Sequence, residues 1–242
     1  MTISSIHRGN VYARNGVVAA SQPLAVSAGL EILRRGGSAA DAAIATSAVL
    51  CVIEPGASHL GGDAFVISHR SSDKSNLAFN GSGEAPNAAD SAAFPHGIDH
   101  HGFRSATVPG LVSTWFAIHE EFGVLPMADL LAPAIEYAES GFPANSGFVR
   151  RIAHHLKLFP DSKLFETLGI STSMQVGDLV TQPDLAESLR QIAEQGRAAF
   201  YTGAIAEKLV LASNGWFSHE DLAQHRTRVF SPLTVPYRDF YV

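Results

Sequence analysis

A short run of small and polar residues, Asn80-Gly81-Ser82-Gly83-Glu84, carries side chains that could line a ligand site. Two glycines around one hydroxyl indicate a tight loop that exposes its backbone. The run is not a nucleophile elbow, because that motif needs Gly-x-Ser-x-Gly and residue 80 is asparagine. The loop is therefore either one wall of a binding site or a turn with no ligand role, and the residues alone leave both open.

The densest group of metal-ligand side chains is His96, Asp99, His100 and His101. Such spacing could in principle serve a transition metal. We interpret the group as a loop instead, because adjacent side chains rarely converge on one ion and no supporting hydrogen-bond pattern is evident. The pair Gly61-Gly62 has neither Walker nor Rossmann spacing, so no nucleotide site is predicted. We expect neither a metal nor a cofactor.

Composition limits the class of partner. The 242 residues carry a formal net charge of -6, and no run of Lys or Arg exceeds two residues, which argues against nucleic acid or an anionic membrane. The single Cys51 excludes an intrachain disulfide and is best explained as a core residue. The longest apolar block, 39–53, falls short of the roughly 20 residues of a membrane span. No secretory signal pattern opens the sequence, so we expect a cytoplasmic protein.

The elements before the loop are marked by clear start and stop signals. A helix over 23–35 is predicted, because Pro23 suits a first turn and Gly36-Gly37 supplies the positive φ that ends a helix. Ser38 and Asp41 predict a capping box at the start of the next helix. That second helix is apolar nearly all round, which is typical of a central, buried element.

The remaining pattern predicts a sheet with a helical scaffold. Strands are expected at 64–68 and 77–80, so that Asn80 ends the second strand. Apolar periodicity predicts helices at 111–122, 126–140, 146–158 and 185–195, and a short one after Ser218. Further capping boxes are predicted at Thr181 to Asp184 and at Ser218 to Asp221. Residues 233–242 indicate a single edge strand that has lost its continuation, which we interpret as truncation.

Motifs in a fixed order run through the chain, among them Gly16-Val-Val-Ala-Ala-Ser-Gln-Pro23, Ile32-Leu-Arg-Arg-Gly-Gly-Ser-Ala-Ala-Asp-Ala-Ala43, Leu60-Gly-Gly-Asp-Ala-Phe65, Glu84-Ala-Pro86 and Thr107-Val-Pro-Gly-Leu-Val112. Later motifs are Leu131-Ala-Pro-Ala-Ile-Glu-Tyr-Ala138, Phe200-Tyr-Thr-Gly203 and Tyr237-Arg-Asp-Phe-Tyr-Val242. In this order they resemble the N-terminal part of the gamma-glutamyltransferase (glutathione hydrolase) family of N-terminal-nucleophile hydrolases. The resemblance extends over nearly the whole chain.

The resemblance implies a proenzyme that cuts itself before a threonine. The hydroxyl of that threonine then acts as nucleophile and its own α-amine acts as base. In the family this threonine opens a Thr-Thr-His-like motif, and no threonine of this sequence is followed by Thr-His. We therefore expect no catalytic residue in this chain and place the nucleophile in a C-terminal small subunit, which would be its partner.

The resemblance also bears on substrate choice. Alignment on Ala85-Pro86 puts Ser82 where members specific for γ-glutamyl compounds carry an arginine, and Gly83 where they carry a glutamate. A neutral hydroxyl cannot replace that cation, and losing a charge-assisted hydrogen bond costs about 1.5 to 3 kcal/mol, or one to two powers of ten in affinity. By resemblance, the substrate-binding residues would be Asn80, Gly81, Ser82 and Glu84, with Gly61 and Gly62 permitting close approach of backbone layers.

The expected fold class is α+β, a four-layer αββα sandwich of which residues 1–242 form the N-terminal, helix-rich part as a single domain. The complete protein would cleave or transfer γ-glutamyl or related acyl groups from small amides such as glutathione. This chain alone would be inactive. Two alternatives stay open: a non-glutamyl amide acylase of the same family, and a catalytically inactive, truncated product that binds a partner or ligand.

Overall fold

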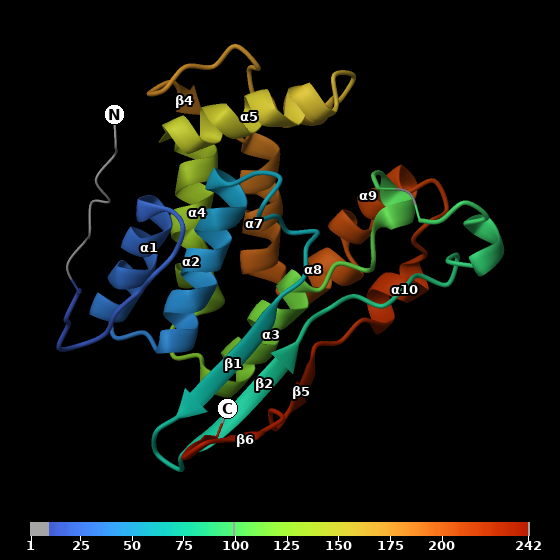
Figure 1. Ribbon diagram of the computed structural model, residues 1–242. Coiled ribbons are helices and arrows are strands. Elements are labelled where there is room, and N and C mark those ends of the chain that lie inside the picture. Colours follow the sequence, from blue (N-terminus) through green and yellow to red (C-terminus); the bar gives the residue numbers. More distant parts are fainter. Residues whose placement is uncertain (1–9, 99, 242) are drawn as a thin grey trace.

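The computed structural model describes residues 10–98 and 100–241. The helices are α1 (Pro23–Arg34), α2 (Ala39–Ile53), α3 (Leu111–Phe122), α4 (Met127–Ser140), α5 (Ser146–Leu158), α6 (Leu164–Thr167), α7 (Pro183–Gln195), α8 (Arg197–Tyr201), α9 (Ala204–Ala212) and α10 (His219–Gln224). The strands are β1 (Phe65–Arg70), β2 (Ser75–Asn80), β3 (Phe142–Pro143), β4 (Leu179–Val180), β5 (Arg228–Phe230), β6 (Pro236–Tyr237) and β7 (Phe240–Tyr241). Two 3₁₀ turns, Ser91–Ala93 and Phe103–Ser105, lie in the long connection from β2 to α3. Figure 1 shows α1, α2, α4 and α7 side by side, with the β1–β2 hairpin extending below them.

Helix α2 begins with the predicted capping box. The Asp41 backbone N–H donates to Ser38 Oγ at 3.0 Å, and the Ser38 N–H donates to Asp41 Oδ2 at 2.9 Å. The buried Asp41 carboxylate also accepts from the backbone N–H groups of Val124 and Leu125. One carboxylate therefore caps α2 and anchors the connection between α3 and α4, which satisfies donors that burial would otherwise leave unpaired.

The small residues of α1 and α2 allow these helices to pack very closely. A Cβ atom added at Gly29 of α1 would lie 2.3 Å from Thr46 Oγ1 of α2. No larger residue fits at that crossing without moving the helices apart. Helix α1 ends at Arg34, one residue before the predicted end, and Gly36 has the positive φ expected of the residues that follow a helix.

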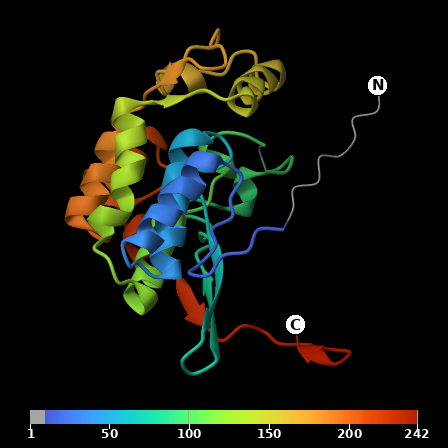
Figure 2. The ribbon, with the colours of Figure 1, turned by 90° about the vertical axis from the view of Figure 1, so that its left-hand side faces the viewer.

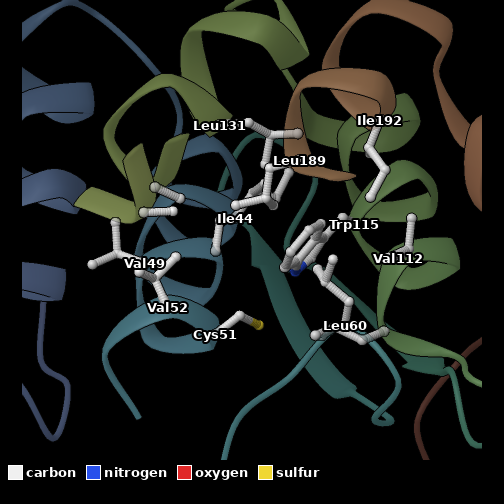
Figure 3. Close-up of a cluster of buried hydrophobic side chains, with 14 of the residues drawn as sticks. Ile44, Val49, Cys51, Val52, Leu60, Val112, Trp115, Leu131, Leu189 and Ile192 are labelled. Carbon is white, nitrogen blue, oxygen red and sulfur yellow. The ribbon is translucent and has the colours of Figure 1, made fainter. Parts of the chain in front are cut away.

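The hydrophobic core surrounds α2, as its all-round apolar sequence predicts. Ile44, Val49 and Val52 of α2 are fully buried, and Figure 3 shows them with Trp115 of α3, Leu131 of α4 and Leu189 of α7. Cys51 lies in this cluster, and burial raises the pKa of its thiol to about 12. The expectation that Cys51 is a small core residue is confirmed.

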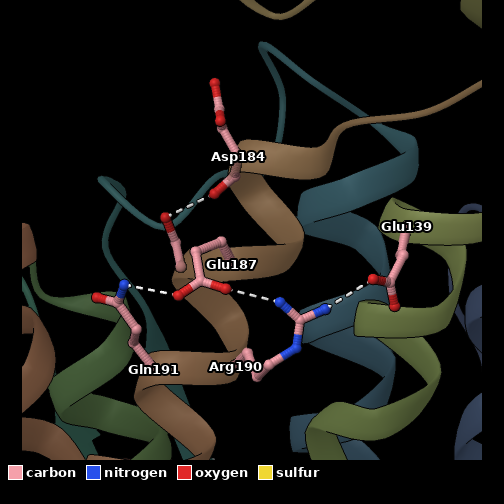
Figure 4. Close-up of polar contacts among 6 residues, drawn as sticks. Glu139, Asp184, Glu187, Arg190 and Gln191 are labelled. Atoms are coloured by element: carbon pink, nitrogen blue, oxygen red, sulfur yellow. Dashed lines mark hydrogen bonds and ion pairs between the residues drawn. The ribbon is translucent and has the colours of Figure 1, made fainter.

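Polar contacts join the outer surfaces of α4 and α7. Arg190 of α7 donates to Glu139 of α4 at 3.0 Å and to Glu187, on its own helix, at 2.7 Å, as Figure 4 shows. Exposed ion pairs of this kind contribute little to stability, because water screens their charges. The packing of α4 on α7 therefore depends on the apolar side chains beneath this network.

The main sheet has three antiparallel strands in the order β1-β2-β5. One face packs on α3, where Phe79 meets Phe122 edge to face at 6.2 Å between ring centroids. On the other face Phe65 is 71% exposed and Ile67 is 77% exposed. In Figure 2 the sheet is seen nearly edge-on, with the packed helices to one side of it. The described chain thus covers one face of the sheet and leaves the other open.

Three sequence predictions differ from the structure. Residues 233–242 do not form a single strand, because Arg238 has φ of 55° and turns the chain into the short β6–β7 hairpin; Val242 lies outside the described residues. No capping box forms at Thr181, because α7 begins at Pro183 and residue 182 takes the N-cap position. Helices α6, α8 and α9 and strands β3, β4 and β5 were not predicted.

Among the described residues, no helix combines the length and apolar character that crossing a membrane requires.

Candidate functional site

Residues 80–84, here called the wall loop, leave the end of β2 in a turn built by Asn80. The Asn80 Oδ1 atom accepts from the Ser82 backbone N–H at 2.9 Å and from Ser82 Oγ at 2.7 Å. Because the Ser82 hydroxyl donates its proton to Asn80, its oxygen has only lone pairs left for a ligand. The Asn80 side-chain N–H groups have no partner among the described residues and remain available as donors.

Glycines fix the wall loop against the start of α3. A Cβ atom at Gly83 would lie 1.7 Å from the Val108 carbonyl oxygen, and one at Gly81 would lie 1.8 Å from Thr114 Oγ1. Gly110 meets Gly81 in the same way, with 1.7 Å between its Cβ position and the Gly81 oxygen. Only glycine allows these backbones to touch, so the loop has little freedom to move relative to α3.

A second segment, residues 61–64, holds the wall loop from the other side. The Gly81 N–H donates to Ala64 O at 2.9 Å, and the Gly83 N–H donates to Asp63 Oδ1 at 3.1 Å. The Gly62 carbonyl accepts from the first N–H groups of α3, at 2.9 Å from Gly110 and 2.8 Å from Leu111. The backbone of Gly62 thus lies against the start of α3, but a Cβ at Gly61 or Gly62 would meet only His59, so glycine is sterically required at Gly81, Gly83 and Gly110 and not at these two positions.

Two buried residues, Tyr201 and His225, pack near the start of α3, where the wall loop meets it. The Tyr201 hydroxyl donates to Pro109 O at 2.8 Å and accepts from the Ser113 N–H at 3.0 Å. Burial raises the pKa of Tyr201. Its ring stacks on the His225 ring with 5.7 Å between centroids, and the Arg197 guanidinium lies 4.3 Å from its centroid. Arg197 also donates to the His225 carbonyl.

His225 is a second buried titratable group of this region, beside Tyr201. Its side chain is 6% exposed, and its Nε2 atom has no hydrogen-bond partner among the described residues. Burial, reinforced by the positive charge of Arg197, lowers the pKa of His225. The ring lines a cavity of about 60 Å³ together with Glu84 of the wall loop. A neutral imidazole thus lies directly beneath the loop.

Sequence reasoning missed Tyr201 and His225 as supports of the loop. Tyr201 lies in a quoted motif, but its distance in sequence from Pro109 gave no sign of the contact. Of the predicted residues, the structure places Asn80, Gly81 and Ser82 together at the end of β2, and the exposed Glu84 is one of the residues that line the cavity beside His225.

Two further features of the described chain are the histidine group near residue 100 and a cavity beside α2. The described residues contain no group of three or more His, Cys, Asp or Glu placed to hold a metal ion, and Asp99 of the predicted cluster lies outside them. The cavity, of about 670 Å³, lies between residues 15–20 and α2 and is lined mainly by small apolar side chains. It has no titratable lining residue and therefore offers no acid–base chemistry.

Comparison with known proteins gives the family. Residues 25–242 match the model of the family described as gamma-glutamyltranspeptidase. The chain belongs to the gamma-glutamyltranspeptidase family. The predicted resemblance is therefore confirmed, and the chain corresponds to the large-subunit portion of such proteins.

Relatives in this family differ in their named reactions. The glutathione hydrolase-like YwrD proenzyme of Bacillus subtilis (strain 168) is 37% identical over 90% of this chain and 43% of its own length. The oxamate amidohydrolase proenzyme of Klebsiella pneumoniae is 35% identical over 96% of this chain and 46% of its own length. This chain thus spans less than half the length of these curated relatives.

Solved structures of the family share the fold. The cephalosporin acylase from Bacillus halodurans superposes with a TM-score of 0.90 at 34% identity, over 100% of this chain and 48% of that one. The Helicobacter pylori gamma-glutamyltranspeptidase gives a TM-score of 0.89 at 29% identity, over 97% of this chain and 70% of that one. The chain has the helix-rich part of the gamma-glutamyltranspeptidase fold, with a few strands.

Proposed function

We propose that this chain is the large-subunit part of an amide-cleaving acyltransferase and supplies the scaffold and one wall of its substrate site. The observation that carries the proposal is the wall loop itself, a segment locked by Gly81 and Gly83 at the end of β2. Among the described residues, it leaves the Asn80 amide donors and the Ser82 hydroxyl lone pairs for a ligand. The nucleophile would be an N-terminal threonine of a C-terminal part, whose strands would cover the open sheet face and complete a four-layer sandwich.

In the proposed reaction, the threonine hydroxyl attacks the amide carbonyl and its α-amine takes the proton. The amine leaves with a proton, and an acyl-threonine ester remains. Water or a second amine then attacks the ester and releases the acyl group. Backbone N–H donors of the C-terminal part would stabilise the oxyanion. This chain would contribute substrate orientation through Asn80, Ser82 and Glu84.

The second part of the proposal concerns which acyl group the complete protein would accept. Ser82 offers no positive charge where γ-glutamyl-specific members have one, which favours an acylase for other amides over a strict glutathione hydrolase. The names of the relatives, which include an oxamate amidohydrolase and a cephalosporin acylase, show that acyl groups vary within this family.

A catalytically inactive product remains the alternative. Within the part of the chain that the structure describes, one hydroxyl is hydrogen-bonded to a histidine, Ser162 Oγ to His155 Nε2 at 2.8 Å. Ser162 Oγ also accepts from the Leu164 N–H at the start of α6, and no carboxylate orients His155. This pair is better explained as part of a local turn that precedes α6 than as a nucleophile and base.

The test is an assay with a chromogenic γ-glutamyl amide and a chromogenic uncharged acyl amide, combined with intact-mass measurement. We expect no turnover from this chain alone, and turnover of one amide after the threonine-bearing C-terminal part is added. The mass of the C-terminal part should then increase by the acyl group during turnover. Acylation of this chain, at Ser162 or elsewhere, would contradict the proposal.

A further inference from the structure

Three side chains form a row across the end of the sheet, directly beside the wall loop. Asn80 of β2 pairs with Phe65 of β1 on one side and with Arg228 of β5 on the other. Residues directly opposite one another in a sheet project from the same face. This is the open face, because the neighbouring residue Phe79 projects toward α3. Figure 1 shows β5 alongside β2 at this end of the hairpin.

Arg228 differs from the other arginines near the sheet. Arg197 donates to the His225 carbonyl, Arg226 donates to the Ala223 and His225 carbonyls, and Arg70 pairs with Glu121. Arg228 is exposed and, among the described residues, has neither a hydrogen bond nor an ion pair. Its guanidinium therefore has five uncommitted donors.

Arg228 is within reach of the wall loop. Arg228 lies directly opposite Asn80, the last residue of β2 and the first of the wall loop, and side chains of such opposite pairs have Cβ atoms about 4.5 to 5.5 Å apart. The guanidinium can thus occupy the space in front of Asn80. The Asn80 side chain also has N–H groups without a partner among the described residues. Arg228 and Asn80 both offer hydrogen-bond donors, so a ligand between them needs an acceptor group.

Covering the open face would make an unpaired guanidinium costly. The proposed function, on which this inference rests, places a second layer over Phe65 and Ile67, so Arg228 would lose much of its water. A desolvated cation needs an anion with good geometry. Asp63 is already bonded to the Gly83 N–H, and Glu84 lies beside His225, so neither acid near the loop is paired with Arg228.

We propose that Arg228 binds a carboxylate on the acyl group of the substrate, with Asn80 as a second donor and Phe65 as the apolar surface for the connecting carbons. The substrate class is then an amide whose acyl chain carries a terminal carboxylate. Selection for this charge comes from β5, although residue 82 itself is neutral. Arg228 is a specificity-determining residue and takes no part in bond making.

The test uses the complete protein, this chain with its C-terminal part, and two donors that differ only in charge. These are glutaryl p-nitroanilide and its carboxamide counterpart, 4-carbamoylbutyryl p-nitroanilide. Arg228→Gln should lower the ratio of kcat/KM for the anionic over the neutral donor by about 10- to 100-fold, the value of one charge-assisted hydrogen bond or bidentate pair. Arg150→Gln, which removes an exposed and equally unpaired arginine on α5, should leave the ratio unchanged.

A binding measurement separates this inference from the proposed function. The dissociation constant of glutarate for the complete protein, measured by calorimetry, does not depend on turnover, and Arg228→Gln should raise it by a similar factor. If neither amide is cleaved, the proposed function fails, while the glutarate result still decides the role of Arg228. Three results would overturn the inference, and the first two are no glutarate binding by the unaltered protein and an unchanged ratio together with unchanged binding. Weaker association of the two parts with an unchanged ratio would also overturn it, since Arg228 would then pair with an acid of the C-terminal part.

Discussion

At the scale of single residues, the wall loop contains hydrogen-bond groups that already have a partner and others that remain available to a ligand. Ser82 donates to Asn80, so it can only accept from a substrate, whereas Asn80 keeps two donors free. The loop is therefore suited to neutral contacts close to the turn, and in our proposal its positive charge comes from Arg228 of β5. Changes of charge at position 82 should act on substrate preference without disturbing the fold, because the side chain is only half-buried.

In the complete enzyme, Ser82→Arg should raise the preference for a γ-glutamyl donor over an uncharged acyl donor. The gain should be about 10- to 100-fold in the ratio of kcat/KM, because a second guanidinium would then face the donor carboxylate. Ser71→Arg is the matched control, since it adds the same charge at the exposed turn at the far end of the hairpin. An unchanged ratio in Ser82→Arg would show that the alignment on Ala85-Pro86 is wrong.

The buried His225 predicts a loss of stability in mild acid. Its pKa is lowered in the folded protein, by burial and then by Arg197, with Arg226 adding to the effect and Asp63 and Glu84 opposing it. Above pH 6.5, about the pKa of histidine in the unfolded chain, His225 is neutral in both the folded and the unfolded state. Below that pH the unfolded chain takes up a proton and the folded protein does not. The free energy of unfolding therefore falls by up to about 1.4 kcal/mol per pH unit, until the pH reaches the pKa of His225 in the folded protein.

His225→Phe keeps a ring against Tyr201 but cannot take a proton. Its free energy of unfolding, from urea titrations at about pH 7.5 and about pH 5.5, should decrease less on acidification than that of the unaltered chain. His219→Phe, at an exposed position of α10, should retain the full decrease. The same acid sensitivity in His225→Phe and the unaltered chain would assign the effect to other groups.

At the scale of elements, the site depends on three backbone segments that touch: residues 61–64, the wall loop and residues 108–111. A Cβ atom at Gly83 would overlap the Val108 carbonyl, whereas a Cβ atom at Gly61 would lie 3.5 Å from the nearest atom, His59 Nδ1. This contrast offers a matched pair within one site.

Gly83→Ala should destabilise the chain by about 1 to 3 kcal/mol, because the added methyl overlaps the Val108 carbonyl and the segments must separate. Gly61→Ala should change stability by less than about 0.5 kcal/mol. Urea unfolding followed by circular dichroism measures both. Equal effects of the two substitutions would mean that the crossing is not held by the Gly83 contact.

Local signals explain which elements could be predicted. Helices α1 and α2 follow from Pro23, Gly36-Gly37 and the Ser38 capping box, all of which act within a few residues. Strand β5 has three residues and exists because β2 offers it a partner, so no local pattern marks it. The position of Asn80 at a strand end could therefore be predicted, while Arg228 beside it could not.

At the scale of the whole molecule, the open sheet face is the dominant exposed apolar surface of the hairpin. Phe65, Ile67 and Phe230 project from it and are 71%, 77% and 45% exposed. Apolar patches of this kind on an isolated protein favour association. The proposed function assigns this face to the C-terminal part, so the chain alone should find a substitute partner in a second copy of itself.

Ile67→Lys should therefore shift the isolated chain toward monomer, because one charge at the centre of the face must lose its water on association. Light scattering after size-exclusion chromatography measures the change. Leu211→Lys, on α9 and 84% exposed, should leave the association state as it was. In the complete protein Ile67→Lys should also weaken joining of the two parts. A monomeric unaltered chain would contradict this account of the face.

The pairing of β2 with β5 also has a consequence for synthesis on the ribosome. Ala78 and Phe230, which face each other in the sheet, are separated by about 150 residues of chain. At translation rates of about 5 to 20 residues per second, β2 emerges roughly 10 to 30 seconds before its neighbour. During that interval one edge of the nascent hairpin has no strand beside it. A cell that makes this protein therefore needs either a chaperone that shields the early hairpin or helices that fold quickly enough to keep it from other nascent chains.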